Sequence, residues 1–437
     1  MNEEPQNPES GSGAEPDGIP EELLFDRITP HGGALPIHLF FNRPFLWLLI
    51  GQMVSAVAFW ALLAAEFSDA AFRFKASPTQ QFILWGAFSA PFVLLTPFQS
   101  VLVDRWSPKW MNFIGYVMLL AAIPPAFYGH SVAALYLSMF FMGVADASIR
   151  PASSALTGLL VDGKDLVRAN GMLSAGLQIA GIIGLVTCGI LIGSSHETQG
   201  VYLMTLVASL LSLPFFALIQ DKRHGRDMPA MRVRDLVDGA VTSFRHPELR
   251  LLMLMSIAMF VAIAVFVSLE PLFVKNTIGL KQQAVSYIWA AHSVGALIGA
   301  LDLTRTKEGR GRELGFIGLA FVIAGVGALL YVAGATYAAA LVGSAIMGVG
   351  FSRFFAPSLA LIQRAAEPEK RGRVTSVFLV LEESMGMFAA LGFAALALPS
   401  SAVEPILLVG AVFMVLVGLV ALVTLRRRAA VTDEQAA

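Results

Sequence analysis

Charged residues within long apolar stretches are the first features of this chain that could do chemistry. Asp146 and Arg150 stand four residues apart with the acid first, the favourable order for an ion pair on one helix. A charge inside a membrane span costs about 2.5–3.5 kcal/mol on insertion scales, so such residues are usually paired or functional. Two interpretations stay open: the pair neutralises itself, or Arg150 faces a cavity while Asp146 tunes it or carries a proton.

Arg353 has no acidic residue three or four positions away, so its partner must come from another helix, the substrate or cavity water. Glu382 and Glu383 are the acids at comparable depth. Because they are consecutive, they lie about 100° apart on a helix, and we expect only one to meet Arg353 or the cavity. Gln178 is the equivalent of Glu383 in an internal repeat described below. We interpret these residues as lining a cavity.

Glu66 and Glu270 each lie near the outer end of the first helix of their half. A carboxylate in partly apolar surroundings could carry protons, and the alternative is an interfacial acid hydrated among the lipid headgroups.

No cluster of His, Asp and Glu has metal-ligand spacing. Nucleophile-elbow, zinc-protease and phosphate-loop motifs are also missing from the sequence. We therefore expect no metal, no cofactor and no enzyme.

The composition sets the class of protein that must hold these residues. The chain has 437 residues, of which 56% are apolar and only 14% charged, and its mean hydropathy is +0.69. A soluble chain would carry about a quarter charged residues, so this is a polytopic membrane protein. The net charge of −1 offers no broad basic face for nucleic acid. The single cysteine, Cys188, excludes an internal disulfide framework.

Twelve stretches are long and apolar enough to cross a bilayer, which takes about 20 residues each. The long connection 221–250 divides them six and six. We predict spans at 45–70, 79–103, 110–128, 131–158, 170–193, 201–220, 251–274, 284–303, 314–333, 337–363, 374–398 and 404–425. The domains follow as an acidic disordered tail (1–43), a first bundle (44–220), a central loop (221–250), a second bundle (251–425) and a C-terminal tail (426–437).

The distribution of basic residues predicts the orientation. With the N-terminus in the cytoplasm, 24 Lys and Arg residues lie on the cytoplasmic side and 4 on the other. Positive charge is retained on the cytoplasmic side of membranes, so both termini are expected there. The first 43 residues lack the basic start and apolar core of a signal peptide, and no cleavage is expected.

The second half of the chain looks like a copy of the first. A shift of 205 residues lays 142–144 (Met-Gly-Val) on 347–349 (Met-Gly-Val), and it carries Arg168 onto Arg373. Repeated halves in membranes usually build a central site between them. The loop after the second span reads Ser-Val-Leu-Val-Asp-Arg-Trp-Ser-Pro-Lys over 100–109, and a degenerate Asp-Leu-Thr-Arg follows the eighth span at 302–305.

These features resemble the major facilitator superfamily, in particular its bacterial exporter branch containing enterobactin and macrolide efflux proteins. The family pattern in the loop is Gly-x-Leu-x-Asp-Arg-x-Gly-Arg-Lys, from which Ser100, Ser107 and Pro108 depart. The resemblance covers about residues 40–426 and implies an all-α fold of twelve transmembrane helices in two six-helix bundles.

The resemblance also implies a gate at the cytoplasmic end. There Asp104 would lie beside the start of the eleventh span, whose helix end carries partial positive charge, a contact of about 1 kcal/mol. Arg105 and the second copy, Asp302 and Arg305, would belong to the same device. The alternative is an ordinary charged loop beside a helix.

The hypothesis is therefore a monomeric secondary exporter in a bacterial inner membrane that works by alternating access. Its partners would be the lipid bilayer, a small amphipathic or lipophilic substrate (drug- or siderophore-like) and protons. Two alternatives stay open. One is a lysophospholipid transporter of the same fold, and the other is a membrane receptor or scaffold that uses the acidic tail.

Overall fold

The computed structural model describes residues 39, 41–105, 107–162, 165–195, 197–219, 241, 244–245, 247–303, 310–365 and 371–436. Most of the predicted N-terminal tail and central loop lie outside these ranges. Within them the chain forms twelve long α-helices: α2 (Arg43–Phe72), α3 (Pro78–Arg105), α4 (Pro108–Tyr128), α5 (Val132–Leu160), α6 (Leu166–Ser195), α7 (Gln199–Ala217), α9 (Pro247–Asn276), α10 (Gln283–Leu303), α11 (Arg310–Gly334), α12 (Tyr337–Ala365), α13 (Arg371–Ala395) and α14 (Val403–Ala436).

Ten of these described helices are long and apolar enough to cross a membrane. The other two, α3 and α13, are 28 and 25 residues long and pack against each other between the two halves. The predicted all-α fold of two six-helix bundles, α2–α7 and α9–α14, is confirmed. The observed helices match the predicted spans to within a few residues at most ends.

Local chemistry explains where α2 begins. The Asn42 side chain accepts a hydrogen bond from the Phe45 N–H at 3.3 Å and donates one to the Leu160 carbonyl at 2.8 Å. The first contact caps α2, and the second ties its start to the end of α5. Leu39 is buried against Phe45 and Val161, so the packed chain starts a few residues before the predicted boundary at 43.

Two departures from the family loop pattern have a local explanation. The Ser107 hydroxyl accepts a hydrogen bond from the Lys109 N–H at 3.2 Å and thereby caps α4. Pro108 occupies the first position of that helix, where its missing N–H costs nothing. The Lys109 ammonium also donates to the Ala217 carbonyl at 2.9 Å, which fastens this loop to the end of α7.

The last helix runs further than the sequence predicts. The twelfth span was expected to end at 425, followed by a short tail, but α14 continues to Ala436. Residues 426–436 contain neither glycine nor proline and include three consecutive arginines and several alanines. Good helix formers with no stop signal let the helix propagate beyond its apolar part.

The internal repeat is visible in the helix boundaries. The pairs α3 and α10, α5 and α12, and α6 and α13 each begin 205 residues apart, and both α5 and α12 are 29 residues long. The first helices of the two halves end in the same turn, shifted by 204. The Ala76 N–H donates to the Ala70 carbonyl at 2.8 Å, and the Leu280 N–H donates to the Val274 carbonyl at 3.0 Å. Gly279 provides the left-handed conformation in the second turn, with φ of 75°.

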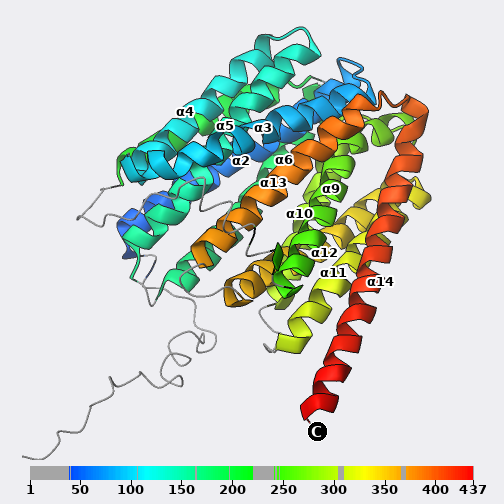
Figure 1. Cartoon of the computed structure of the whole chain (residues 1–437). Helices are drawn as coiled ribbons and strands as arrows, with labels where there is room; N and C mark the ends of the chain where they lie inside the picture. Colours follow the sequence, from blue (N-terminus) through cyan, green and yellow to red (C-terminus); the bar gives the residue numbers. More distant parts are fainter. Residues whose placement is uncertain are drawn as a thin grey trace, which may run out of the picture.

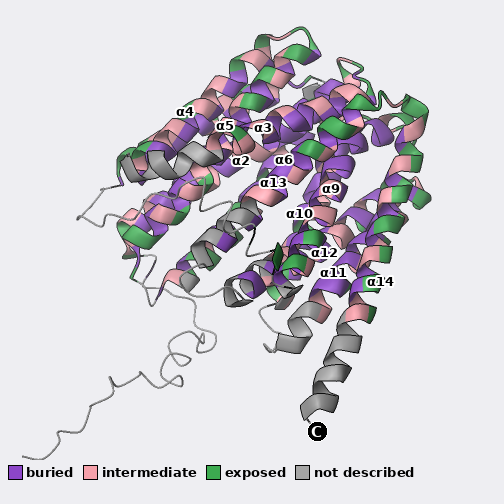
Figure 2. Cartoon of the chain, viewed as in Figure 1, coloured by how far each residue is buried: buried purple, intermediate pink, exposed green. Residues whose placement is uncertain are grey.

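The helices of the two halves converge at one end of the molecule and spread apart toward the end where the C-terminus lies (Figure 1). We name the converging end, which carries the turns 73–77 and 277–282, the distal end, and the opposite one the proximal end. The large apolar side chains of Val409, Leu416 and Val420 on α14 are exposed. Figure 2 shows exposed positions along this helix. Exposed apolar side chains on a membrane helix are suited to contact with acyl chains.

Candidate functional site

Arg150 is held by a carboxylate on its own helix, α5. Its Nη2 lies 2.6 Å from Asp146 Oδ2, and its Nε lies 3.0 Å from Asp146 Oδ1. Two parallel bonds fix the plane of the guanidinium as well as its position. The spacing of four residues predicted this pair, and the structure contains it.

The same guanidinium joins the two halves of the molecule. Arg150 Nη1 lies 3.1 Å from Glu383 Oε1 on α13, so one arginine links α5 of the first half to α13 of the second. Of the two consecutive glutamates in α13, Glu383 is therefore the one that meets an arginine. Both positions are near the middle of their helices, at a depth where an unpaired charge would be costly.

Arg150 is nevertheless accessible. Its side chain is 54% exposed, whereas the side chain of Glu383 is 9% exposed. The guanidinium also lies 5.1 Å from the centre of the Phe92 ring on α3, within the range of a cation–π contact. Contacts to α3 and α13, the helices that meet between the halves, place Arg150 on the inner side of the first bundle. An arginine fixed by two acids with half its surface free can still accept an anionic ligand.

The partner of Arg353 comes from another helix, as predicted, but it is a different acid from the two predicted. Arg353 on α12 forms an ion pair with Asp302 at the end of α10, within the second half. The sequence indicates Glu382 or Glu383 instead, and both of these acids lie on α13. Depth along the helices could not distinguish these acids, because the rotation and tilt of neighbouring helices decide which side chains meet. The pair joins a residue expected to line a cavity with one expected to form the gate.

Among the described residues, neither Glu382 nor Gln178 forms an ion pair with Arg150 or Arg353. Glu382 is 2% exposed, and its Oε1 has no hydrogen-bond partner among the described residues. Gln178 is half-buried on α6. Of the residues expected to form a gate, Asp104 and Arg105 end α3. Their side chains, and the whole of Arg305, lie outside the described part of the chain.

Glu66 and Glu270 occupy matching positions, 204 residues apart, the same shift that relates the turns following their helices. Both are buried, at 0% and 8% exposed. Glu66 accepts a hydrogen bond from the Ser138 hydroxyl, and Glu270 accepts one from Trp289 Nε1 at 2.9 Å. The alternative of interfacial acids wetted by headgroups is therefore wrong, because burial and protein donors replace the water.

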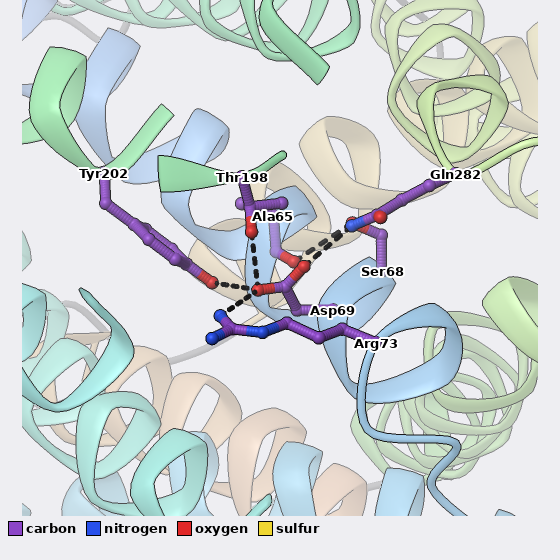
Figure 3. A network of polar contacts seen from close by, with 7 residues as sticks. All are labelled: Ala65, Ser68, Asp69, Arg73, Thr198, Tyr202 and Gln282. Atoms are coloured by element: carbon purple, nitrogen blue, oxygen red, sulfur yellow. Dashed lines mark hydrogen bonds and ion pairs between the residues drawn. The ribbon is translucent and has the colours of Figure 1, made fainter. Parts of the chain in front are cut away.

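One buried acid was missed by the sequence analysis. Asp69, near the end of α2, is 1% exposed and lies at the centre of a polar network at the distal end (Figure 3). Its Oδ2 accepts hydrogen bonds from Thr198 at 2.7 Å and Tyr202 at 2.8 Å and lies 3.5 Å from Arg73. Its Oδ1 accepts a hydrogen bond from Gln282 of the second half at 2.8 Å. The four-residue spacing of Asp69 and Arg73 was the available signal.

Other described contacts between the halves also lie at this end. Lys275 donates to the Ala71 carbonyl at 2.6 Å. The Ser286 hydroxyl on α10 lies 3.2 Å from the Cys188 sulfur on α6. A Cβ added at Gly189 would stand 2.6 Å from the Tyr287 ring, so this ring packs against the backbone of α6 in space that only glycine leaves free. We name this contact zone between α6 and α10 the distal seam.

The fold and these contacts define a polytopic membrane protein of two related bundles that meet at a charged centre. Residues 48–390 match the Major Facilitator Superfamily, and the chain belongs to this family of membrane transporters. The match identifies the superfamily but does not identify the enterobactin and macrolide efflux branch within it.

The chain is also similar to individual proteins. The lysophospholipid transporter LplT of Serratia proteamaculans is 29% identical over 151 residues, which cover 34% of this chain and 37% of the relative. The Photorhabdus laumondii protein of the same name is 33% identical over 144 residues, covering 33% and 35%. The chain thus matches just over a third of the length of these curated relatives.

Solved structures share the fold across nearly the whole chain. A mutant of the nucleoside transporter NupG has a TM-score of 0.72 and 13% identity, covering 87% of this chain and 99% of its own. A bacterial homologue of the human drug peptide transporters has a TM-score of 0.66 and 12% identity, covering 90% and 98%. At such identities the likeness describes the fold alone.

Proposed function

We propose that this protein is a secondary transporter that moves an amphipathic lipid of the lysophospholipid class across a bacterial inner membrane by alternating access. The observation that carries the proposal is the position of Arg150, which is half exposed and bonded to both halves at once. The similarity to lysophospholipid transporters supports the substrate class, over the part of the chain that it covers.

The chemistry of Arg150 fits a phosphate headgroup. A guanidinium presents a planar fork of donors that matches phosphate oxygens two at a time. A phosphate bound to the remaining Nη1 and Nη2 protons of Arg150 would lie beside the Glu383 carboxylate, and the repulsion between these like charges would weaken the Arg150–Glu383 bond. Substrate binding would thereby replace a bond between the halves with a bond to the cargo. A ligand that binds one arrangement of the halves more tightly shifts their equilibrium by its differential affinity.

The orientation follows from the basic residues. If positive charge marks the cytoplasm, the proximal end faces inward and the contacts of the distal seam close the outer side. Arg150 would then be reached from the cytoplasmic side in this conformation.

For proton coupling, we propose Glu66 and Glu270 as proton carriers, because one buried acid lies at the same place in each half. The proposed gate consists of Asp104, Arg105, Asp302 and Arg305.

Transport of a labelled lysophospholipid in proteoliposomes tests the proposal. The full chain is reconstituted, labelled lysolipid is added outside, and albumin extraction reports the fraction that remains in the outer leaflet. We expect protein-dependent translocation, slowed by an excess of unlabelled lysolipid and dependent on an imposed proton gradient.

A lipophilic dye without a phosphate is measured in parallel vesicles. Dye efflux that lysolipid leaves unchanged, together with lysolipid movement at the rate of protein-free vesicles, would contradict the lysolipid proposal and favour the drug-like substrate. Lysolipid movement indifferent to the gradient would remove only the proton coupling. Deleting residues 1–38 addresses the scaffold alternative, since transport should survive the deletion.

A further inference from the structure

We propose that Asp69 is the hub of a reversible latch that holds the two halves closed at the distal end. The inference rests on the proposed alternating access, but it concerns one defined contact, Asp69 with Gln282, whose state can be measured without any substrate. The two oxygens of this carboxylate bind different halves of the molecule: Oδ2 is bound within the first half, and Oδ1 is bound by the second. The contact to the second half can therefore break while the contacts within the first half remain.

The Oδ2 atom anchors the carboxylate within the first half. Thr198 and Tyr202, at the start of α7, donate to it at 2.7 and 2.8 Å, and Arg73 lies 3.5 Å away, four residues further along the chain from Asp69. These partners belong to the same bundle as Asp69, so they move with it. The charge therefore keeps hydrogen-bond donors whether or not the halves are in contact, and opening does not leave a buried anion unpaired.

The Oδ1 atom faces the second half. It accepts a hydrogen bond from Gln282 Nε2 at 2.8 Å, and the same nitrogen lies 3.1 Å from the Ser68 hydroxyl (Figure 3). Gln282 stands in the turn before α10, whose shape is set by the left-handed Gly279. A hydrogen bond to a carboxylate is stronger than one between neutral groups, yet a single such bond is weak enough to break on each cycle.

A second contact acts beside the first. The Lys275 ammonium donates to the Ala71 carbonyl in the last turn of α2 at 2.6 Å. Carbonyls in the last turn of a helix lack intrahelical partners and carry partial negative charge, so a lysine there is favourable. Both contacts connect the end of α2 to the segment 275–282 of the second half. Separating these segments would release both contacts together.

The single native cysteine gives the latch a direct readout. Cys188 is fully buried in the distal seam and contacts Ser286 of the other half. When the distal end opens, this thiol should become accessible to a small maleimide, so its labelling rate measures the open fraction. The experiment uses the full chain in lipid nanodiscs with N-ethylmaleimide and no substrate.

Gln282→Glu places a second carboxylate against Asp69 Oδ1, and like charges in contact favour separation. We expect Cys188 labelling to accelerate about tenfold or more, the effect of a modest shift in a two-state population. The double variant Asp69→Asn with Gln282→Glu exchanges donor and acceptor. The amide oxygen introduced at position 69 still accepts from Thr198 and Tyr202, and the amide nitrogen donates to the carboxylate introduced at position 282. We expect labelling to return to within about threefold of wild type.

Labelling of Gln282→Glu at the wild-type rate would overturn the latch, and so would a double variant that labels as fast as the single one. Gln282→Ala, a change in a surface turn, provides an independent variant in which the bond is removed without added charge. It should label at an intermediate rate. Labelling of the denatured proteins at one common rate controls for thiol reactivity. Since no substrate enters the assay, its result stands apart from the lysolipid experiment.

Discussion

Replacing Arg150 with alanine should reduce transport to the rate of protein-free vesicles. The variant loses both the bond to Glu383 and the two-pronged site for a phosphate. Two charge-assisted hydrogen bonds to the substrate are worth at least about 3 kcal/mol, which corresponds to about 150-fold weaker binding. Isothermal titration with a short-chain lysophospholipid, beside the proteoliposome assay, measures both losses.

Two variants make the Arg150 result specific. Arg150→Lys keeps the charge but loses the planar fork, so we expect weak binding and partial transport. Arg353→Ala removes an arginine of similar depth whose ion pair with Asp302 stays within the second half. It should cost stability and leave substrate affinity within about threefold of wild type. Equal loss of binding in Arg150→Ala and Arg353→Ala would contradict the assignment of the site to Arg150.

A disulfide across the distal seam should stop transport reversibly. The Ser286 hydroxyl lies 3.2 Å from the Cys188 sulfur, so Ser286→Cys brings two thiols together with a single substitution. A disulfide is about 2.05 Å long, and small side-chain rotations close the difference. Because the two cysteines belong to different halves, the bond would hold the distal end shut. We expect oxidation to reduce transport at least about twentyfold, as no thermal opening breaks a covalent bond, and a reductant to restore it.

The matched controls use the same oxidant. Wild type has one cysteine and cannot form an internal disulfide, and the double variant Cys188→Ser with Ser286→Cys has one as well. Both should transport at the same rate before and after oxidation. Loss of maleimide-reactive thiols in the denatured protein shows that the bond has formed. A fully oxidised Ser286→Cys protein that transports at its reduced rate would mean that the distal end need not open.

Contacts within one helix could be predicted from the sequence, and contacts between helices could not. The Asp146–Arg150 pair follows from a spacing of four residues on a helix that apolar length alone predicts. The bond from Arg150 to Glu383 joins residues 233 positions apart and depends on how α5 and α13 are rotated. The same dependence explains why Arg353 meets Asp302 instead of a glutamate of α13.

Asp69 could not be predicted from the sequence for a different reason. An acid close to the end of a predicted span looks like an ordinary interfacial charge, and its side-chain donors do not reveal themselves in sequence. Thr198, Tyr202 and Gln282 lie 129, 133 and 213 residues away from it. Only the packed bundle shows that this carboxylate is buried and shared between the two halves.

We expect the two halves to rock about Arg150, so that one end of the molecule opens as the other closes. Double electron–electron resonance measures this motion between spin labels in a Cys188→Ser background. One pair of labels spans the two halves at the distal end, at the exposed positions His130 and Thr336. A second pair spans them at the proximal end, at Asp162 and Arg250. With lysophospholipid added, we predict a longer distal distance and a shorter proximal one. Distances that stay fixed, or that change in the same direction, would contradict the account.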